Sequence, residues 1–211
     1  MPASTPAIAT SLAFPKLSEA LGLFGGTFDP IHFGHLVAAE AVAKSYELDS
    51  VIFVPTGNPW QKEAISSANH RLAMTQLAVS YFPDFMVSTV DIDRGGDTYT
   101  VDTLRDLKKL HPEASFFFIT GADSLAGINT WKDSELLWDL AHFVGVTRPG
   151  HDLQVPRSPA GAVTLLEIPA LAVSSSEIRA KVISGESLEG LVPLKVINYI
   201  EKHNLYRGKN D

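Results

Sequence analysis

Residues 25–35, with the sequence GGTFDPIHFGH, decide how the rest of this 211-residue chain is interpreted. They follow a short apolar run, residues 21–24, and precede a segment with helical character, residues 36–46. A strand that enters a Gly-Gly turn and then a helix gathers main-chain N–H groups and the positive end of the helix dipole around one point. The stretch therefore predicts an anion site of the kind that binds a phosphate.

Two histidines, His32 and His35, stand three residues apart at the expected start of this helix. If the first helical turn begins there, both rings reach the same side. One alternative is a plain strand–helix loop with incidental histidines. Another is a zinc site, which is disfavoured because the chain has no cysteine and no HExxH spacing. The stretch is neither a Walker P-loop nor a GxGxxG dinucleotide fingerprint.

Composition indicates one globular domain. The length suits a single core, and 45% apolar with 19% charged residues is typical of a folded protein. Residues 1–19 begin with small and proline residues and no early positive charge, so we expect a disordered leader rather than a signal peptide. We expect the domain to span residues 20–207. The absence of cysteine excludes disulfides and thiolate catalysis and is compatible with a cytoplasmic enzyme.

The net charge of the chain limits the classes of partner that it is expected to bind. A formal net charge of −7 argues against broad nucleic-acid binding, which requires a basic face. It does not exclude a nucleotide substrate, because a few local cations and a helix end can hold phosphates. No apolar run approaches the roughly 20 residues that span a bilayer. The sequence leaves open whether the chain forms a homo-oligomer.

Apolar runs alternate with helical periods, which predicts an α/β fold with a parallel sheet. The expected strands are residues 21–24, 51–54, 85–90, 115–120, 142–146 and 163–168. The expected helices are residues 36–46, 69–81, 98–110, 133–140 and 194–203, and one more that has Ser175 or Ser176 as its N-cap and ends at 183; a turn is expected at 93–97. Ligands of such sheets bind at the carboxyl ends of the strands. The stretches 25–26, 55–57, 121–123 and 147–148 all follow a strand, so we expect them to converge on one edge.

The eleven residues 25–35 resemble the (T/H)xGH signature of the nucleotidyltransferase superfamily. Their longer pattern, G-G-[ST]-F-D-P-[IV]-H-x-G-H, is similar to that of the bacterial nicotinate-nucleotide adenylyltransferases. The resemblance covers about residues 20–205. It implies a single Rossmann-like domain with a parallel sheet flanked by helices and a short helical C-terminal tail. It also implies that His32 and His35 hold the phosphates of ATP with the amides of Gly26 and Thr27, and that Gly25 and Phe28 belong to the same ATP-binding stretch.

A second motif is SSSEIR, in which Ser175 and Ser176 stand at an expected helix start and Arg179 lies one turn later. It is similar to the family's I-S-S-T-x-I-R motif, which implies a second ATP-phosphate contact with Arg179 as a catalytic cation. Taken alone, the same residues are typical of a helix capping box.

Two further cations are implied by resemblance. Lys62 in PWQK is similar to the family's loop lysine, which reaches a phosphate, although the identity of that phosphate stays open. It counts with His32, His35 and Arg179 among the catalytic candidates; the alternative is a solvated loop lysine. Arg148 in TRPG matches a strand-end arginine of the family, which implies that it faces a phosphate whose identity also stays open.

The nicotinate ring is the expected ligand of two other stretches. Residues 98–104, which include Thr98, Tyr99 and Thr103, are similar to the family's Y-T-x-x-T-L helix start, and Trp131 is similar to its T-W stretch. A helix N-terminus suits a carboxylate, and an indole face suits a cationic pyridinium ring. The alternative for Trp131 is core packing. Gly121 and Asp123 resemble the family's G-x-D contact to adenosine, with a helix-capping aspartate as the alternative.

The resemblance implies adenylyl transfer from ATP to nicotinate mononucleotide, with release of pyrophosphate and with Mg²⁺ carried on the triphosphate. No carboxylate pair marks a metal cage held by protein side chains alone. Three other interpretations stay open: an adenylyltransferase acting on nicotinamide mononucleotide, one acting on phosphopantetheine, and a non-catalytic nucleotide sensor.

Overall fold

A computed structural model describes residues 18–59, 64–147, 155–168 and 173–208. Within these residues the chain builds a six-stranded sheet in the order β4-β2-β1-β6-β7-β8, and every neighbouring pair is parallel. The strands are β1 (Ala20–Gly26), β2 (Ser50–Pro55), β4 (Phe85–Val87), β6 (Ser115–Gly121), β7 (His142–Thr147) and β8 (Val163–Glu167). The predicted parallel α/β sheet is therefore confirmed, and the strand order reverses direction between β1 and β6.

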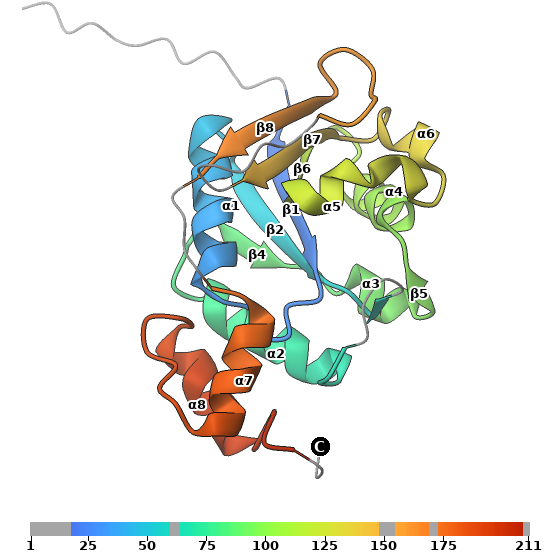
Figure 1. The fold of residues 1–211 in the computed structure, drawn as a ribbon. Helices are drawn as coiled ribbons and strands as arrows, with labels where there is room; N and C mark the ends of the chain where they lie inside the picture. The colour runs from blue at the N-terminus through green and yellow to red at the C-terminus, as the bar shows by residue number, and fades with distance from the viewer. Residues whose placement is uncertain (1–17, 60–63, 148–154, 169–172, 209–211) are drawn as a thin grey trace, which may run out of the picture.

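Alternating strand residues supply two cores, one on each face of the sheet. Phe24 and Phe53 face a core that includes α1 (Phe33–Ser45), α2 (Ala68–Val79), α7 (Ser175–Ser184) and α8 (Leu194–Lys202). Leu23 and Ile52 face the other core, which includes α4 (Thr100–Leu110), α5 (Ala122–Ala126) and α6 (Ser134–Leu137). This division follows from the two-residue period of a strand, which sends successive side chains to opposite faces. The layered arrangement is visible in Figure 1.

The helices α7 and α8 form the expected helical C-terminal part of the domain. The α8 helix packs against α2, and both helices lie at one end of the molecule (Figure 1). The segment after α8 is also packed, because Leu205 and Tyr206 are buried. Residues 1–17 lie outside the described part, so the predicted boundary of the leader stays a prediction.

The segment after β4 differs from expectation. The predicted strand 85–90 ends at Val87, and a short helix, α3 (Val90–Arg94), includes the first two residues of the turn expected at 93–97. Asp91 and Arg94 stand three residues apart and form an ion pair over 2.7 Å, a spacing that places the two side chains on one face of a helix. Residues on either side of this segment form a small parallel pair of strands, β3 (Asn58–Pro59) with β5 (Asp97–Thr98).

Other helix boundaries also shifted. The helix expected at 133–140 covers only Ser134–Leu137, and α5 and a 3₁₀ turn at Ile128–Thr130 were not expected. The helix expected at 69–81 begins at Ala68, with the side chain of Ser67 accepting from the N–H of His70. These are differences of one turn or less at segment ends, or short elements with little periodicity of their own.

Candidate active site

A cavity of about 580 Å³ lies at the carboxyl edge of β1, β6 and β7. Its lining includes residues of the β1–α1 loop, the β6–α5 junction and the start of α7. All of the residues predicted to bind ATP line this one cavity: Gly25, Gly26, Thr27, Phe28, His32, His35, Gly121, Asp123, Ser175, Ser176 and Arg179. The structure thus gathers residues that are up to 154 positions apart in the sequence, from 25 to 179.

His32 and His35 stack directly on each other. Their ring centroids are 3.7 Å apart with an interplanar angle of 26°, so the predicted common side is confirmed. His32 is the N-cap of α1, and its main-chain N–H donates to Nδ1 of His35 over 3.2 Å. Burial and, after it, the neighbouring His32 lower the pKa of His35 well below its usual value. A neutral ring whose Nδ1 accepts a hydrogen bond carries its proton on Nε2, which leaves an N–H donor on the other side of the ring.

Aromatic rings fix the orientation of His35. Phe28 and Phe24 both meet its ring edge to face, with centroids at 5.1 and 5.8 Å. Phe28 is buried and has a left-handed backbone with φ of 51°. A Cβ added at Gly26 would lie 2.8 Å from the Phe28 ring, so only glycine fits there without displacing the ring. Phe28, predicted to bind ATP, packs beneath His35 as well as lining the cavity.

The start of α7 reaches the same loop from the opposite side. Arg179 donates from Nη1 to the main-chain carbonyl of Asp29 over 2.7 Å and from Nη2 to Oγ of Ser176 over 3.1 Å. Ser175 donates to the carbonyl of Pro30 over 2.9 Å. The N-cap is Ser174, whose side chain accepts from the N–H of Glu177, rather than Ser175 or Ser176 as expected. Ser174, Ser175 and Ser176 all line the cavity.

A second, smaller cavity of about 190 Å³ adjoins the first. It contains the predicted ring-binding residues Thr98, Tyr99, Thr103 and Trp131. Its other lining includes Gly25, Gly26, Thr27, Thr120 and Ser124, which also line the larger cavity. The two cavities therefore meet over the Gly-Gly turn that ends β1.

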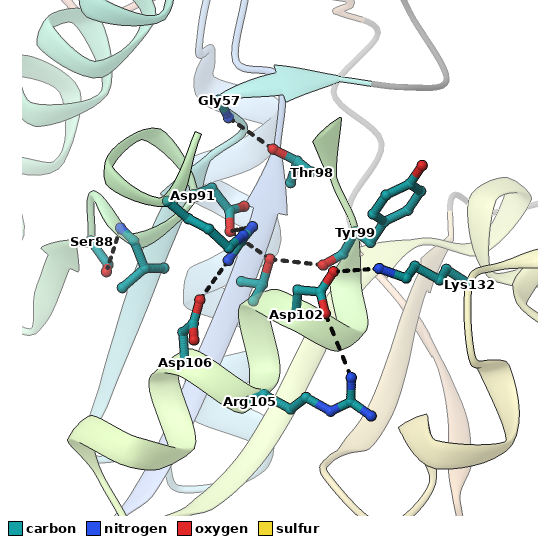
Figure 2. A network of polar contacts seen from close by, with 12 residues as sticks. Gly57, Ser88, Asp91, Thr98, Tyr99, Asp102, Arg105, Asp106 and Lys132 are labelled. Carbon is teal, nitrogen blue, oxygen red and sulfur yellow. Dashed lines mark hydrogen bonds and ion pairs between the residues drawn. The ribbon is translucent and has the colours of Figure 1, made fainter. Parts of the chain in front are cut away.

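A polar network, shown in Figure 2, includes two residues that line the second cavity, Asp91 and Thr103. Asp91 is almost fully buried and accepts from Thr103 Oγ1 over 2.7 Å and from Arg94 over 2.7 Å. Burial raises the pKa of Asp91, while these two hydrogen bonds act in the opposite direction. Arg94 also pairs with Asp106 over 2.7 Å. Because Thr103 already donates to Asp91, its hydroxyl has a structural contact in addition to any ligand contact.

The outer wall of this cavity carries a charged group that sequence reasoning missed. Lys132 pairs with Asp102 over 2.9 Å, and its Nζ lies 4.5 Å from the centre of the Tyr99 ring. Trp131 is half-buried and packs edge to face on Phe118 with centroids 6.3 Å apart. Trp131 thus lines the cavity and also makes a core contact, so it has a feature of each of its two interpretations, ring binding and core packing. The position of Lys132, directly after Trp131, was the available signal.

Arg71 was also missed, and the sequence offers little to single out one arginine in a helix. It is 1% exposed and donates to the carbonyls of Thr27 and Gly57, each over 2.8 Å. It therefore ties the Gly-Gly loop to the loop after β2. Lys62 and Arg148 lie outside the described residues, so their predicted roles stay predictions.

Two further observations concern the described residues as a set. They contain no group of three or more histidine, cysteine or carboxylate side chains that could hold a metal ion. None of their helices is both long and apolar enough to cross a membrane.

Comparison with known proteins identifies the class first. Residues 23–181 match the sequence model of the cytidylyltransferase-like family, so the chain is a nucleotidyltransferase of that class. A solved structure of Plasmodium falciparum nicotinic acid mononucleotide adenylyltransferase complexed with NaAD has the same fold, with a TM-score of 0.74 and 23% identity. That match covers 92% of this chain and 100% of the other.

Relatives with much higher identity narrow the family. A protein of Streptomyces coelicolor named "Probable nicotinate-nucleotide adenylyltransferase" is 60% identical, over 88% of this chain and 100% of its own. A Corynebacterium glutamicum protein of the same name is 53% identical, over 91% of this chain and 90% of its own. This chain therefore belongs to the nicotinate-nucleotide adenylyltransferase family of enzymes.

Proposed function

We propose that this enzyme transfers the adenylyl group of ATP to nicotinate mononucleotide and releases deamido-NAD and pyrophosphate. The observation that carries the proposal is the junction of two cavities of unequal size over Gly26 and Thr27. The larger suits ATP and the smaller suits a mononucleotide. Reactants held on both sides of one turn would meet at the α-phosphate of ATP.

The larger cavity supplies the groups for the triphosphate. His35 would donate from Nε2–H, and the helix start at His32 and the amides of Gly26 and Thr27 would add neutral donors to the same phosphates. Arg179, Ser175 and Ser176 reach the cavity from α7 and would hold the outgoing pyrophosphate. Gly121 and Asp123, at the end of β6, would contact the adenosine.

The smaller cavity suits a flat ring with an attached carboxylate. Trp131 offers a face for a cationic pyridinium. The α4 helix begins at Thr100 with no side-chain cap at Tyr99, so its positive end would stabilise the carboxylate. Thr98, Tyr99 and Thr103 complete this subsite. On the strength of the family resemblance, Lys62 and Arg148 would each bind a phosphate of one of the two substrates.

The reaction then needs positioning and charge stabilisation. A phosphate oxygen of nicotinate mononucleotide attacks the α-phosphorus of ATP, and the bond from that phosphorus to the bridging oxygen breaks. The electron pair leaves with pyrophosphate, so no protein nucleophile is required. Neutral donors such as His35 bind the negative charge that builds up around the α-phosphorus without reorganising during the step.

Magnesium would arrive with the triphosphate. Asp29 and Asp123 are the carboxylates among the described residues that line the larger cavity. The oxygens of Asp29 already accept hydrogen bonds from neighbouring N–H and hydroxyl groups, so they do not fit a metal. Triphosphate oxygens and water would be the main ligands, as is common for Mg²⁺. The ion would neutralise charge on the leaving pyrophosphate.

We also expect the enzyme to act in the cytoplasm.

The experiment is pyrophosphate release from MgATP with nicotinate mononucleotide, nicotinamide mononucleotide and phosphopantetheine offered separately. We expect a clear preference for the nicotinate compound in kcat/KM. A preference for either of the others would overturn the substrate assignment and retain adenylyl transfer. No release with any of them, while ATP still binds, would favour a nucleotide sensor.

A further inference from the structure

Asp29 is buried and lies in the wall of the larger cavity, and both oxygens of its carboxylate accept hydrogen bonds from other parts of the protein. One oxygen accepts from the main-chain N–H groups of Ile65 and Ser66, over 2.7 and 3.1 Å. The other accepts from the hydroxyl of Ser66 and, over 2.7 Å, from the hydroxyl of Tyr206. Four donors on one carboxylate make it an acceptor that fixes its surroundings rather than a group that reacts.

Tyr206 reaches this position from the segment after α8. Its side chain is buried, and its backbone has a left-handed φ of 66°, which is unusual for a bulky residue. Such a conformation persists where the surrounding contacts hold it. Burial and then the nearby Asp29 raise the pKa of Tyr206, so the phenol keeps its proton and can donate it to the carboxylate.

The main chain at Asp29 and Pro30 is hydrogen-bonded to two side chains that are proposed to bind phosphate. The Asp29 carbonyl accepts from Arg179, and the carbonyl of the next residue, Pro30, accepts from Ser175. The segment that Asp29 holds on the other side, Ile65 and Ser66, follows the predicted catalytic residue Lys62 by three and four positions. One buried carboxylate therefore anchors two parts of the proposed phosphate site.

We propose that Tyr206 is a positioning residue for adenylyl transfer, acting through the carboxylate of Asp29 on the loop that holds Arg179 and Ser175. This inference rests on the proposed function. The Tyr206 hydroxyl limits the orientations open to Asp29, and thereby sets the distance between the α1 and α7 sides of the cavity. Tyr206 itself does not line either cavity among the described residues.

The test compares Tyr206→Phe with Tyr199→Phe. Tyr199→Phe is the control. It removes a hydroxyl from α8 whose contact, over 3.0 Å, is with Nδ1 of His70 and not with Asp29. Both variants are assayed for pyrophosphate release and for binding of a non-hydrolysable ATP analogue, at a temperature where circular dichroism shows each folded. We expect Tyr206→Phe to lower kcat about tenfold and to weaken the analogue about fivefold, while Tyr199→Phe stays within twofold of wild type in both.

A double-mutant cycle with Asp29→Asn shows whether Tyr206 acts through Asp29. On the Asp29→Asn background, the further loss from Tyr206→Phe should fall below twofold, because coupled residues are not additive. Values of kcat and analogue affinity within twofold of wild type for the folded Tyr206→Phe protein would overturn the inference, as would full additivity. If wild type released no pyrophosphate, the proposed function would fail, and the analogue affinities alone would decide the role of Tyr206.

Discussion

The main-chain N–H of His32 donates to Nδ1 of His35, and the two imidazole rings stack with centroids 3.7 Å apart. This contact requires an unprotonated Nδ1 on His35, because a charged imidazolium would carry a hydrogen there. A second imidazolium stacked on the first would also be repelled by it. The pair is therefore built to hold His35 neutral, as an N–H donor rather than a cation.

The neutral state of His35 predicts how the free energy of unfolding depends on pH. The unfolded chain binds a proton at this residue as the pH falls through about 6.5, whereas the folded protein, whose His35 pKa is lowered, does not. Stability should therefore fall as the pH drops from 7.5 to 5.5, by at most about 1.4 kcal/mol per pH unit for one proton. Urea unfolding of wild type and His35→Asn at both values measures it. Because the other histidines are in both proteins, the difference in slope reports His35, and equal slopes would contradict a lowered pKa.

Removing the donor should reduce turnover. His35→Ala loses the Nε2–H group proposed to face the α-phosphate, so we expect kcat to fall by roughly 10²-fold or more, as for one lost transition-state donor. His35→Gln, which can place an amide N–H near the same point, should lose less. His203→Ala is the matched control, because His203 packs on Tyr199 with centroids 4.2 Å apart and lines neither cavity. Near-wild-type turnover in folded His35→Ala would remove this residue from the phosphate site.

Trp131 should contribute to binding of the mononucleotide. Trp131→Ala removes the face proposed for the pyridinium ring, so we expect the KM for nicotinate mononucleotide to rise about tenfold, the equivalent of roughly 1.4 kcal/mol. Trp138→Ala is the control, because Trp138 packs edge to face on Phe143 with centroids 5.5 Å apart. It should lower the melting temperature and leave this KM unchanged. An unchanged KM in Trp131→Ala would assign Trp131 to core packing alone.

The parts of the site that could be predicted are those encoded by local sequence. The strand–glycine–helix order around residues 25–35 places its own amides and histidines, and the carboxyl ends of parallel strands meet at one edge for topological reasons. For these reasons the predicted ATP-binding residues line one cavity. The SSSEIR motif is also local, and its cap shifted by only one or two residues, to Ser174.

The parts that could not be predicted depend on contacts between distant segments. Tyr206 contacts Asp29 across 177 positions, and Arg71 contacts Thr27 across 44. Neither residue belongs to a pattern with a period or a motif. The short helix at Val90–Arg94 was missed for a related reason, since its Asp91 is stabilised by Thr103 from α4 as well as by Arg94. Tertiary pairing there outweighed the strand preference of Val90.

Gly57 allows the loop after β2 to pass close to α3. A Cβ added there would lie 2.6 Å from the main-chain oxygen of Asp91, which is backbone and cannot rotate away. We expect Gly57→Ala to lower the free energy of unfolding by about 1–3 kcal/mol, as for overpacking of a close contact. Gly127→Ala is the control, because its added Cβ would meet only ordinary contacts, the nearest at 3.6 Å. Equal chemical denaturation midpoints for the two variants would contradict the close approach.

Arg71 joins the two loops on which the site depends. Its replacement should lower the free energy of unfolding more than replacement of an exposed arginine does. Arg71→Met keeps the length and apolar stem but leaves the half-buried carbonyls of Thr27 and Gly57 without their donor. Each unsatisfied buried acceptor costs about 1–3 kcal/mol, so we expect a loss of roughly 3 kcal/mol in the free energy of unfolding. Arg105→Met is the control, because Arg105 is 43% exposed and its ion pairs, at 3.6 and 3.7 Å, should be worth less than about 1 kcal/mol. Since Thr27 lies at the junction of the two cavities, folded Arg71→Met should also bind the ATP analogue more weakly than Arg105→Met. Similar unfolding free energies for the two variants would show that water or a rearranged neighbour satisfies these carbonyls, and that Arg71 does not hold the loops together.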